Sequence, residues 1–412
     1  EMLHAFLADE KAGAYERLVD NLLDDPRYGE HQARYWLDAV RYGDTHGLHL
    51  DNRRGIFPYR DWVVHAMNNN VPLDDFMTWQ LAGDLLPDTN LEKQVATGFV
   101  RMNPSTSEGG AIPAEFQAKN NFDRVESFGT VLLGMSLTCA RCHTHKYDPI
   151  PQTEYYELLA FFNNTAEGPL DGNSYTYGPT VKAPSSVAEW AQWNELQATR
   201  RALLTQASEK LTPAERTQWA DASSEERFKM IVDGSLDFSE LKQDANEVVE
   251  RLNKLEAGFT TTLVAKELPR PRETKLLKRG EYDLSHGDPL QPDVFSVMGE
   301  LPANAPRNRL GLAQWASSRG HPLVARVLVN RIWQRTFGNG LVRTPEDFGL
   351  QGQQPTHPEL LDWLAVEMQD SNWDLKHLLK IMVTSRTFQQ SSARREEIDD
   401  PENRLLARGP SF

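Results

Sequence analysis

The sequence predicts a mainly α fold, in which a helical-hairpin insertion and a small β segment separate two helical domains. Apolar residues recur at helical spacing over most of the chain, and strand-like runs are confined to residues 257–300. The 412 residues are enough for two or three domains with several hydrophobic cores. We expect a helical domain with the cysteine motif at 1–185, the hairpin at 186–256, the β segment and linker at 257–300, and a C-terminal helical domain at 301–412.

Each expected element follows from a local pattern. In the insertion, Trp190, Trp193, Val248 and Leu252 lie at helical spacing among charged residues, which is typical of two packed helical arms. In the β segment, two short runs rich in Thr and Leu flank a proline-containing turn. The helical patterns of the two domains cover residues 14–23, 59–68, 76–85, 323–337, 360–368 and 375–383.

The composition narrows the functional classes. The chain has a formal net charge of −15, which argues against a nucleic-acid-binding protein, because such proteins need a basic face. It contains no run of about 18 apolar residues, so we expect no membrane span.

The only two cysteines lie together, and His143 follows the second of them directly in a Cys-x-x-Cys-His motif. Four interpretations compete. Cys139 and Cys142 form a redox dithiol, bind zinc with His145 and Asp148, pack as an unreactive pair, or attach a c-type haem covalently with His143 as the iron ligand. The adjacent histidine favours haem, and covalent attachment takes place outside the cytoplasm, so we expect an exported protein. His145 and Lys146 are candidates for contacts with the haem propionates.

Two polar loops supply the candidate catalytic residues. The segment from Asp44 to Asp51 holds two carboxylates and two imidazoles, His46 and His49, which suits a metal ion, a polar site or a structural loop. A second loop holds Glu108 beside two glycines. We add Arg124 to the residues of these loops. The candidate catalytic residues are then Asp44, His46, His49, Glu108 and Arg124.

The chain resembles the planctomycete-type cytochrome c domain proteins, which carry a haem-motif domain of unknown function and a C-terminal domain of unknown function. The resemblance rests on residues 25–29, 59–63, 80–87, 107–110, 123–126 and 139–151 in the first domain, and on 321–326, 329–334, 337–342, 344–349 and 357–364 in the second. It implies one haem c on Cys139 and Cys142 with His143 as proximal ligand. The sixth ligand stays open among Met102, Met135 and His145, with His46, His49 and a five-coordinate iron as further alternatives.

The resemblance also implies an exported protein, a further cytochrome c domain upstream or a redox partner protein, and a role beside polysaccharide degradation. We therefore predict a haem-dependent oxidoreductase acting on a carbohydrate, such as a sulfated glycan, in which His or Glu accepts the proton and Arg holds an anionic group. Alternative functions are an electron-transfer cytochrome without its own substrate, a metal-dependent hydrolase, and a carbohydrate-binding module that uses the β segment.

Overall fold

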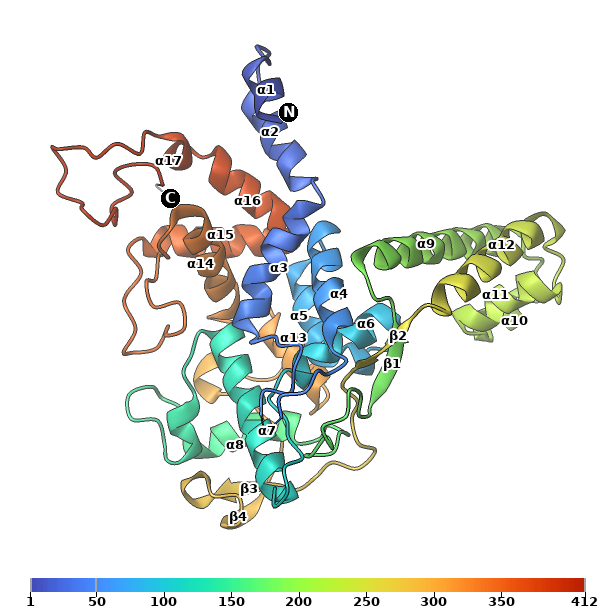
Figure 1. Ribbon diagram of the computed structural model, residues 1–412, viewed down its shortest axis with the longest axis horizontal. Helices are drawn as coiled ribbons and strands as arrows, with labels where there is room; N and C mark the ends of the chain where they lie inside the picture. Colours follow the sequence, from blue (N-terminus) through green and yellow to red (C-terminus); the bar gives the residue numbers. More distant parts are fainter. Residues whose placement is uncertain (1, 49, 411–412) are drawn as a thin grey trace. The chain divides into compact units, whose positions relative to one another are not determined.

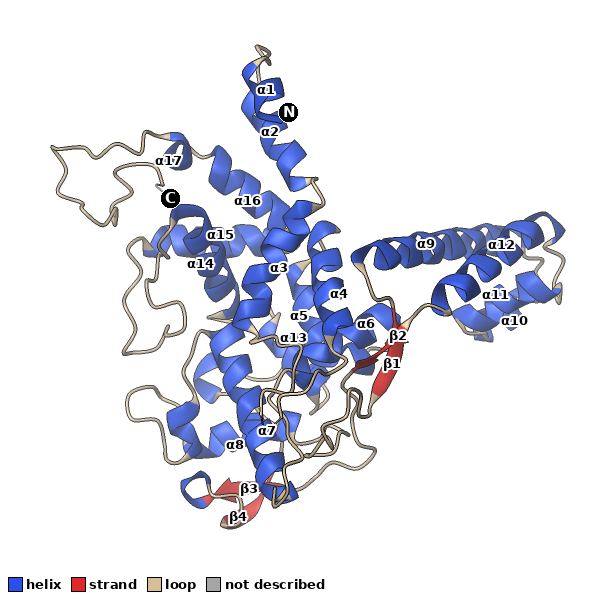
Figure 2. Cartoon of the chain, in the orientation of Figure 1, coloured by secondary structure: helices blue, strands red, loops and turns tan. Residues whose placement is uncertain are grey.

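The computed structural model describes residues 2–48 and 50–410. The chain forms two compact units, one of Glu1–Thr180 with Leu263–Phe412 and the other of Val181–Thr262. Helices dominate both units, and the strands of the described residues form two small two-stranded sheets (Figures 1 and 2). The predicted fold class is confirmed.

The larger unit begins with eight helices, and α4 and α5 contribute an aromatic core. Tyr59 and Trp62 are fully buried on α4, and the ring of Trp62 stacks on Phe76 of α5 with the centroids 5.2 Å apart. Proline at the first turn of α4 and α7 favours the helix start, where a missing N–H costs nothing. The helices are α1 (Met2–Leu7), α2 (Ala14–Leu23), α3 (Arg27–Ala39), α4 (Phe57–Asn68), α5 (Leu73–Ala82), α6 (Leu91–Ala96), α7 (Pro113–Phe128) and α8 (Gln152–Phe162).

Short tight turns connect these helices. The segments η1 (Gly83–Leu85), η2 (Thr97–Arg101) and η4 (Thr138–Arg141) are 3₁₀ turns, and η3 (Gly129–Leu133) is a π turn that extends α7. Such π turns are rare, and they recur at functional sites. Here the π turn leads directly into the cysteine motif.

The C-terminal helices complete the same unit. Helix α13 packs against α5 and α8, α14 packs against η3, and α16 packs against α2. These helices are α13 (Arg309–Ala316), α14 (Val324–Phe337), α15 (Pro358–Asp370), α16 (Leu375–Thr384) and α17 (Arg386–Gln389), and a short 3₁₀ turn, η6 (Ser296–Met298), precedes them. The two ends of the sequence therefore share one core.

The two strand-like runs that flank the proline-containing turn do not pair with each other. Strand β2 (Thr260–Leu263) pairs with β1 (Thr180–Ala183), and β3 (Thr274–Leu277) pairs antiparallel with β4 (Ser285–Leu290). The β3–β4 connection includes η5 (Lys278–Gly280), where Arg279 and Gly280 have left-handed backbone conformations. This connection lies against Cys142, as described below.

The smaller unit contains four helices. The long helices α9 (Val187–Lys210) and α12 (Ser239–Glu256) pack along each other as the two arms of the expected hairpin, and α10 (Glu215–Asp221) and α11 (Ser224–Asp233) connect them. The side chains of Trp190, Trp193 and Val248 are buried in its core. A capping box between Ser223 and Glu226 begins α11.

None of the described helices combines the length and the apolar character that crossing a bilayer requires.

We expect the smaller unit to be removable. Because β1 and β2 pair, the two chain ends that enter and leave this unit are neighbours. Replacing residues 184–259 with a short glycine–serine linker should therefore lower the unfolding temperature of the larger unit by less than about 5 °C in calorimetry. Deleting α13 instead, as a control, should abolish cooperative unfolding. Loss of the larger unit's transition in the first variant would contradict the division into two units.

Candidate functional site

A sharp turn delivers the cysteine motif to the surface. After η3, Gly134 adopts φ 59°, and a Cβ at this position would lie 2.9 Å from both Phe348 and Val327. The Phe348 N–H also donates to the Gly134 carbonyl at 2.8 Å. Only glycine combines this conformation with this close approach, so the turn is locked against the C-terminal helices.

The two cysteines flank a buried anchor. Ala140 and Leu137 are buried, and they hold η4 against the core while Cys139 is exposed and Cys142 is half-buried. Cys139 lies within η4, and Cys142 is the residue that directly follows its end. The Cys142 Sγ donates to the Arg279 carbonyl at 3.1 Å, and both thiols are free.

His143 has the hydrogen bond that an iron ligand needs. Its Nδ1 lies 2.7 Å from the Thr144 carbonyl oxygen, which can only accept. The proton therefore resides on Nδ1, and the Nε2 of this exposed ring keeps its lone pair for a metal. Two free thiols, the first exposed and the second half-buried, followed by an imidazole in this tautomer, are a donor set that fits covalent haem c.

His145 and Lys146 have different surroundings. The Nδ1 of His145 lies 2.9 Å from the Asp148 backbone nitrogen and 3.2 Å from the Asp148 carboxylate, so this ring nitrogen is engaged with Asp148. Asp148 in turn accepts from the Leu350 N–H at 2.7 Å. Lys146 is exposed, with its ammonium 5.1 Å from the centroid of the Tyr147 ring. The hydrogen bond to Asp148 makes His145 a poor axial ligand in this arrangement. Its contact with a propionate and that of Lys146 stay predictions.

The two methionine candidates for the sixth position, Met102 and Met135, are both buried. Their role at the iron stays a prediction.

A cavity of about 740 Å³ lies beside the motif. Thr138, which directly precedes Cys139, belongs to its wall. The other walls come from α3, α4, α7, η3, α14 and α16, so residues far apart in the sequence enclose it. This volume is in the range of small-molecule binding sites.

The cavity wall combines charge with an apolar surface. Arg331 and Arg335 are half-buried on α14, and Met67, Leu328 and Ile332 supply apolar area. Burial raises the pKa of the Glu126 carboxyl, which also lines the cavity, although Arg141 at 3.9 Å opposes this rise. The site can therefore hold a proton on Glu126 at a higher pH than an ordinary carboxyl allows.

Of the residues predicted to be catalytic, Asp44 is exposed and His46 is buried. The Asp44 carboxylate accepts from the Tyr42 hydroxyl and lies 3.8 Å from Arg60. The Nδ1 of His46 lies 2.8 Å from Ser105 Oγ and 2.7 Å from Asp171 Oδ2, and its Nε2 donates to the Ser174 carbonyl at 3.1 Å.

This His–Ser–Asp group is not a hydrolytic triad. In a triad the serine and the carboxylate contact opposite ring nitrogens, whereas here both contact Nδ1 of His46 and a backbone carbonyl occupies Nε2. The histidine instead ties the 44–51 loop to the 105 and 171 loops.

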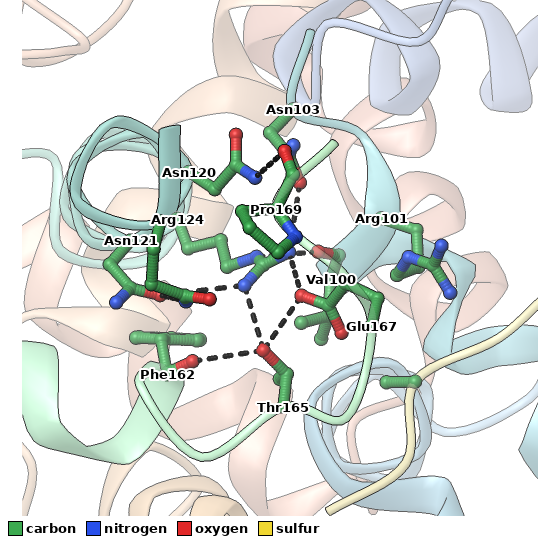
Figure 3. Close-up of polar contacts among 12 residues, drawn as sticks. Val100, Arg101, Asn103, Asn120, Asn121, Arg124, Phe162, Thr165, Glu167 and Pro169 are labelled. Carbon is green, nitrogen blue, oxygen red and sulfur yellow. Dashed lines mark hydrogen bonds and ion pairs between the residues drawn. The ribbon is translucent and has the colours of Figure 1, made fainter. Parts of the chain in front are cut away.

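Arg124 is the centre of a buried polar network (Figure 3). Its guanidinium pairs with Glu167, and it donates to the Val100 carbonyl at 2.9 Å and to the Thr165 hydroxyl at 2.8 Å. Burial tends to raise the pKa of Glu167, but Arg124 and Arg101 outweigh burial and lower it to about 2. Arg124 is therefore engaged with groups of the protein itself, and it has no guanidinium face left for an anionic substrate.

Glu108 lies in an exposed loop, where its N–H donates to the Thr106 hydroxyl at 3.2 Å. His49 lies outside the described residues. Among Asp44, His46 and Arg124, no hydrogen bond or ion pair joins one to another within residues 2–48 and 50–410. The bridge between Gly47 and Ser105 does bring the loop of His46 against the loop that leads to Glu108. The catalytic role of these residues stays a prediction.

Metal sites were also expected. Within the described part of the chain, no three His, Cys, Asp or Glu side chains lie close enough to hold one metal ion, and this includes the zinc alternative at the cysteines. Asp51 accepts from the Gly47 N–H at 2.8 Å. Because His49 is not described, a metal ion between Asp44 and Asp51 stays a prediction.

Two family models match the chain. Residues 1–167 match PSCyt2, a protein of unknown function (DUF1549), and residues 308–412 match PSD1, a protein of unknown function (DUF1553). The chain belongs to the family with this planctomycete cytochrome c-type domain pair. No curated protein and no solved structure gave a match to it. The predicted resemblance is confirmed, and both domains are of unknown function.

The matches correct the expectation about partners. The matched families name no redox partner protein, no upstream cytochrome c domain and no carbohydrate. The prediction that the chain has these partners was therefore wrong. Only the expected lack of a membrane span agrees with the described helices.

Sequence reasoning missed the cavity between the PSCyt2 and PSD1 segments. Its walls combine Trp36 and Glu126 of PSCyt2 with Arg331 and Arg335 of PSD1. One signal was present: Arg331 and Arg335 lie one helical turn apart on a helix whose other residues are mostly apolar. Two arginines on one face of a core helix suggest a site rather than a solvated surface.

Proposed function

We propose that this protein is an exported c-type haem protein that acts as a haem-dependent oxidoreductase on a small molecule. The observation that carries the proposal is the state of the motif: two free thiols three positions apart, followed by His143 with Nδ1 bound to a carbonyl and Nε2 available. Cys139 and Cys142 would form the thioether bonds, and His143 would bind the iron. Once bound, haem would supply one-electron redox chemistry.

The chain's own residues prepare this site. The Arg141 carbonyl accepts from the Tyr156 hydroxyl at 2.9 Å and from the Gln152 side chain at 3.1 Å, so α8 holds the motif rigidly. The Arg141 guanidinium lies 4.9 Å from the centroid of the Phe122 ring, which fixes its direction. A rigid attachment point keeps the reorganisation on electron transfer small.

The cavity favours an enzyme over an electron carrier. A carrier needs only an insulated haem, whereas this protein has a 740 Å³ cavity whose wall includes the neighbour of Cys139. Glu126 in that wall, with its raised pKa, is suited to accept or donate a proton. These features support an assignment as an oxidoreductase with its substrate beside the motif.

The first prediction concerns haem attachment. Protein that is exported and produced with a cytochrome c maturation system should show a Soret band, and the haem should stay with the chain after denaturation. Replacing both Cys139 and Cys142 with alanine should remove essentially all of this covalent haem. A matched variant, His145→Ala, should keep it, because the His145 Nδ1 is occupied by Asp148.

Two results would decide against parts of this proposal. A chain without a Soret band, with zinc found by elemental analysis, would exclude haem and revive the zinc interpretation. If the haem is present but its reduced form ignores carbon monoxide, the iron has two strong ligands, and an electron carrier is the correct function.

A further inference from the structure

Two arginines of the cavity wall, Arg331 and Arg335, lie one helical turn apart on α14, and their positive charges repel each other. Arg331 donates to the Thr130 carbonyl at 2.8 Å, and Arg335 contacts Gln32 Oε1 at 3.2 Å. The guanidinium of Arg335 also lies 4.8 Å from the centroid of the Tyr35 ring. All of these partners are neutral groups.

Neither arginine is in direct contact with a carboxylate of the described residues. Burial lowers the pKa of Arg331, and the charge of Glu346 opposes this shift. Within residues 2–48 and 50–410, no carboxylate lies within 4.0 Å of Arg331 or Arg335, and the Arg331 Nε is buried without a hydrogen-bond partner. Burial and the charge of Arg331 lower the pKa of Arg335 to about 10. Two cations that repel each other in a partly desolvated wall are costly unless an anion joins them.

Other arginines of this unit are more deeply buried, and they are satisfied in two ways. Arg54 and Arg101 donate to backbone carbonyl oxygens, whereas Arg124 and Arg309 form ion pairs. Arg124 pairs with Glu167, and Arg309 pairs with Asp84 at 2.7 Å. In both cases the protein supplies its own carboxylate. Arg331 and Arg335 instead line a cavity, and the carboxylates of that wall lie beyond ion-pair distance of them within the described residues.

We propose that the cavity binds a carboxylate between Arg331 and Arg335, with an apolar or aromatic body against Leu328, Ile332 and Met67. A guanidinium binds a carboxylate with two parallel hydrogen bonds, which suits the unpartnered Arg331 Nε. The wall also contains three carboxylates, Asp38, Glu126 and Glu346, and these disfavour a second negative charge on the ligand. The ligand is therefore a monocarboxylate at this end rather than a polyanion.

This carboxylate has two sources. One is a free organic acid. The other is a propionate of the haem, because Thr138 of the same wall adjoins Cys139. Only the second source rests on the proposed haem, so the two sources are separable by experiment.

The probe is 2-naphthoate, with 2-naphthamide as its neutral isostere, titrated by calorimetry at pH 7. The titrations use the haem-loaded protein and, separately, the Cys139→Ala, Cys142→Ala variant, which cannot attach haem. We expect naphthoate, but not the amide, to bind the cysteine-free variant. Arg331→Gln and Arg335→Gln should each weaken binding at least tenfold. The matched control Arg319→Gln, at an exposed arginine paired with Asp370, should bind normally.

The outcomes distinguish the sources. Binding to both forms assigns the site to a free organic acid, and binding to the cysteine-free form alone assigns it to a haem propionate. Naphthoate that binds neither form overturns the proposal, as does equal affinity of the arginine variants and the parent.

Each variant is first checked for an unchanged unfolding transition. Should Arg331→Gln fail to fold, Arg331→Lys should still weaken binding, because lysine keeps the positive charge but lacks the paired N–H donors of the guanidinium. If the parent protein proves to carry no haem, the titration of the Cys139→Ala, Cys142→Ala variant still tests the carboxylate site.

Discussion

Replacing Arg309 with leucine is expected to lower the free energy of unfolding by about 3–5 kcal/mol, because it leaves buried carboxylates without their cation. The Arg309 side chain is fully buried, and it donates to the two carboxylate oxygens of Asp84 at 2.9 and 2.7 Å. It also donates to the Leu81 carbonyl at 2.7 Å, and its Nε lies 3.4 Å from Glu267. One side chain thus joins three segments of the larger unit.

Urea unfolding at pH 7 measures this effect. The matched control is Arg307→Leu, two residues away, where the arginine is exposed and pairs with an exposed Asp293. Exposed pairs contribute about 1 kcal/mol or less, so the control should unfold almost as the parent does. A difference below about 1 kcal/mol between the two variants would show that Arg309 is not the structural tie that its geometry indicates.

A second large effect is expected at Glu167, and it depends on pH. Burial alone would raise the pKa of this carboxyl, but Arg124 and Arg101 lower it to about 2 from an ordinary value of 4.5. A carboxyl with a lowered folded-state pKa stabilises the protein above pH 4.5 and loses this effect as the pH falls toward 2. Glu167→Gln should therefore cost about 3 kcal/mol at pH 7, since it leaves Arg124 buried without its counter-charge.

The difference between parent and Glu167→Gln should shrink when unfolding is repeated at pH 4.5, 3.5 and 2.5. The control is Asp123→Asn, whose carboxylate pairs on the surface with Arg41, and we expect a change of about 1 kcal/mol or less at every pH. A pH-independent difference for Glu167→Gln would mean that lost packing, rather than charge, is responsible.

The helices could be predicted because each carries its own periodic signal. Apolar residues recur at helical spacing in 14–23 and 324–337, and this spacing located α2 and α14, although Val19 alone is buried on α2 and most of α14 is buried. The π turn at Gly129–Leu133 could not be predicted, since its apolar run has no strand or helix period. The strand partners were also out of reach, because β1 and β2 pair across the whole insertion.

The candidate site was only half visible in the sequence. The cysteine motif is local, and five consecutive positions identify it. The role of Arg124 was not visible, because Glu167, which occupies it, comes from a distant loop. The cavity was hidden for the same reason, since the Arg331 and Thr130 that meet at its wall lie 201 residues apart in sequence.

The close contact of Gly134 with Phe348 and Val327 makes the PSCyt2 and PSD1 segments depend on each other during evolution. The turn that presents the cysteines, and the wall of the neighbouring cavity, are completed by residues of the PSD1 segment, which lies far along the sequence from the motif. A recombination event that separated the PSCyt2 and PSD1 coding segments would leave each half with an open, unsatisfied face. Natural selection should therefore keep the two segments together as one inherited module, while the insertion between them is free to vary in length and sequence.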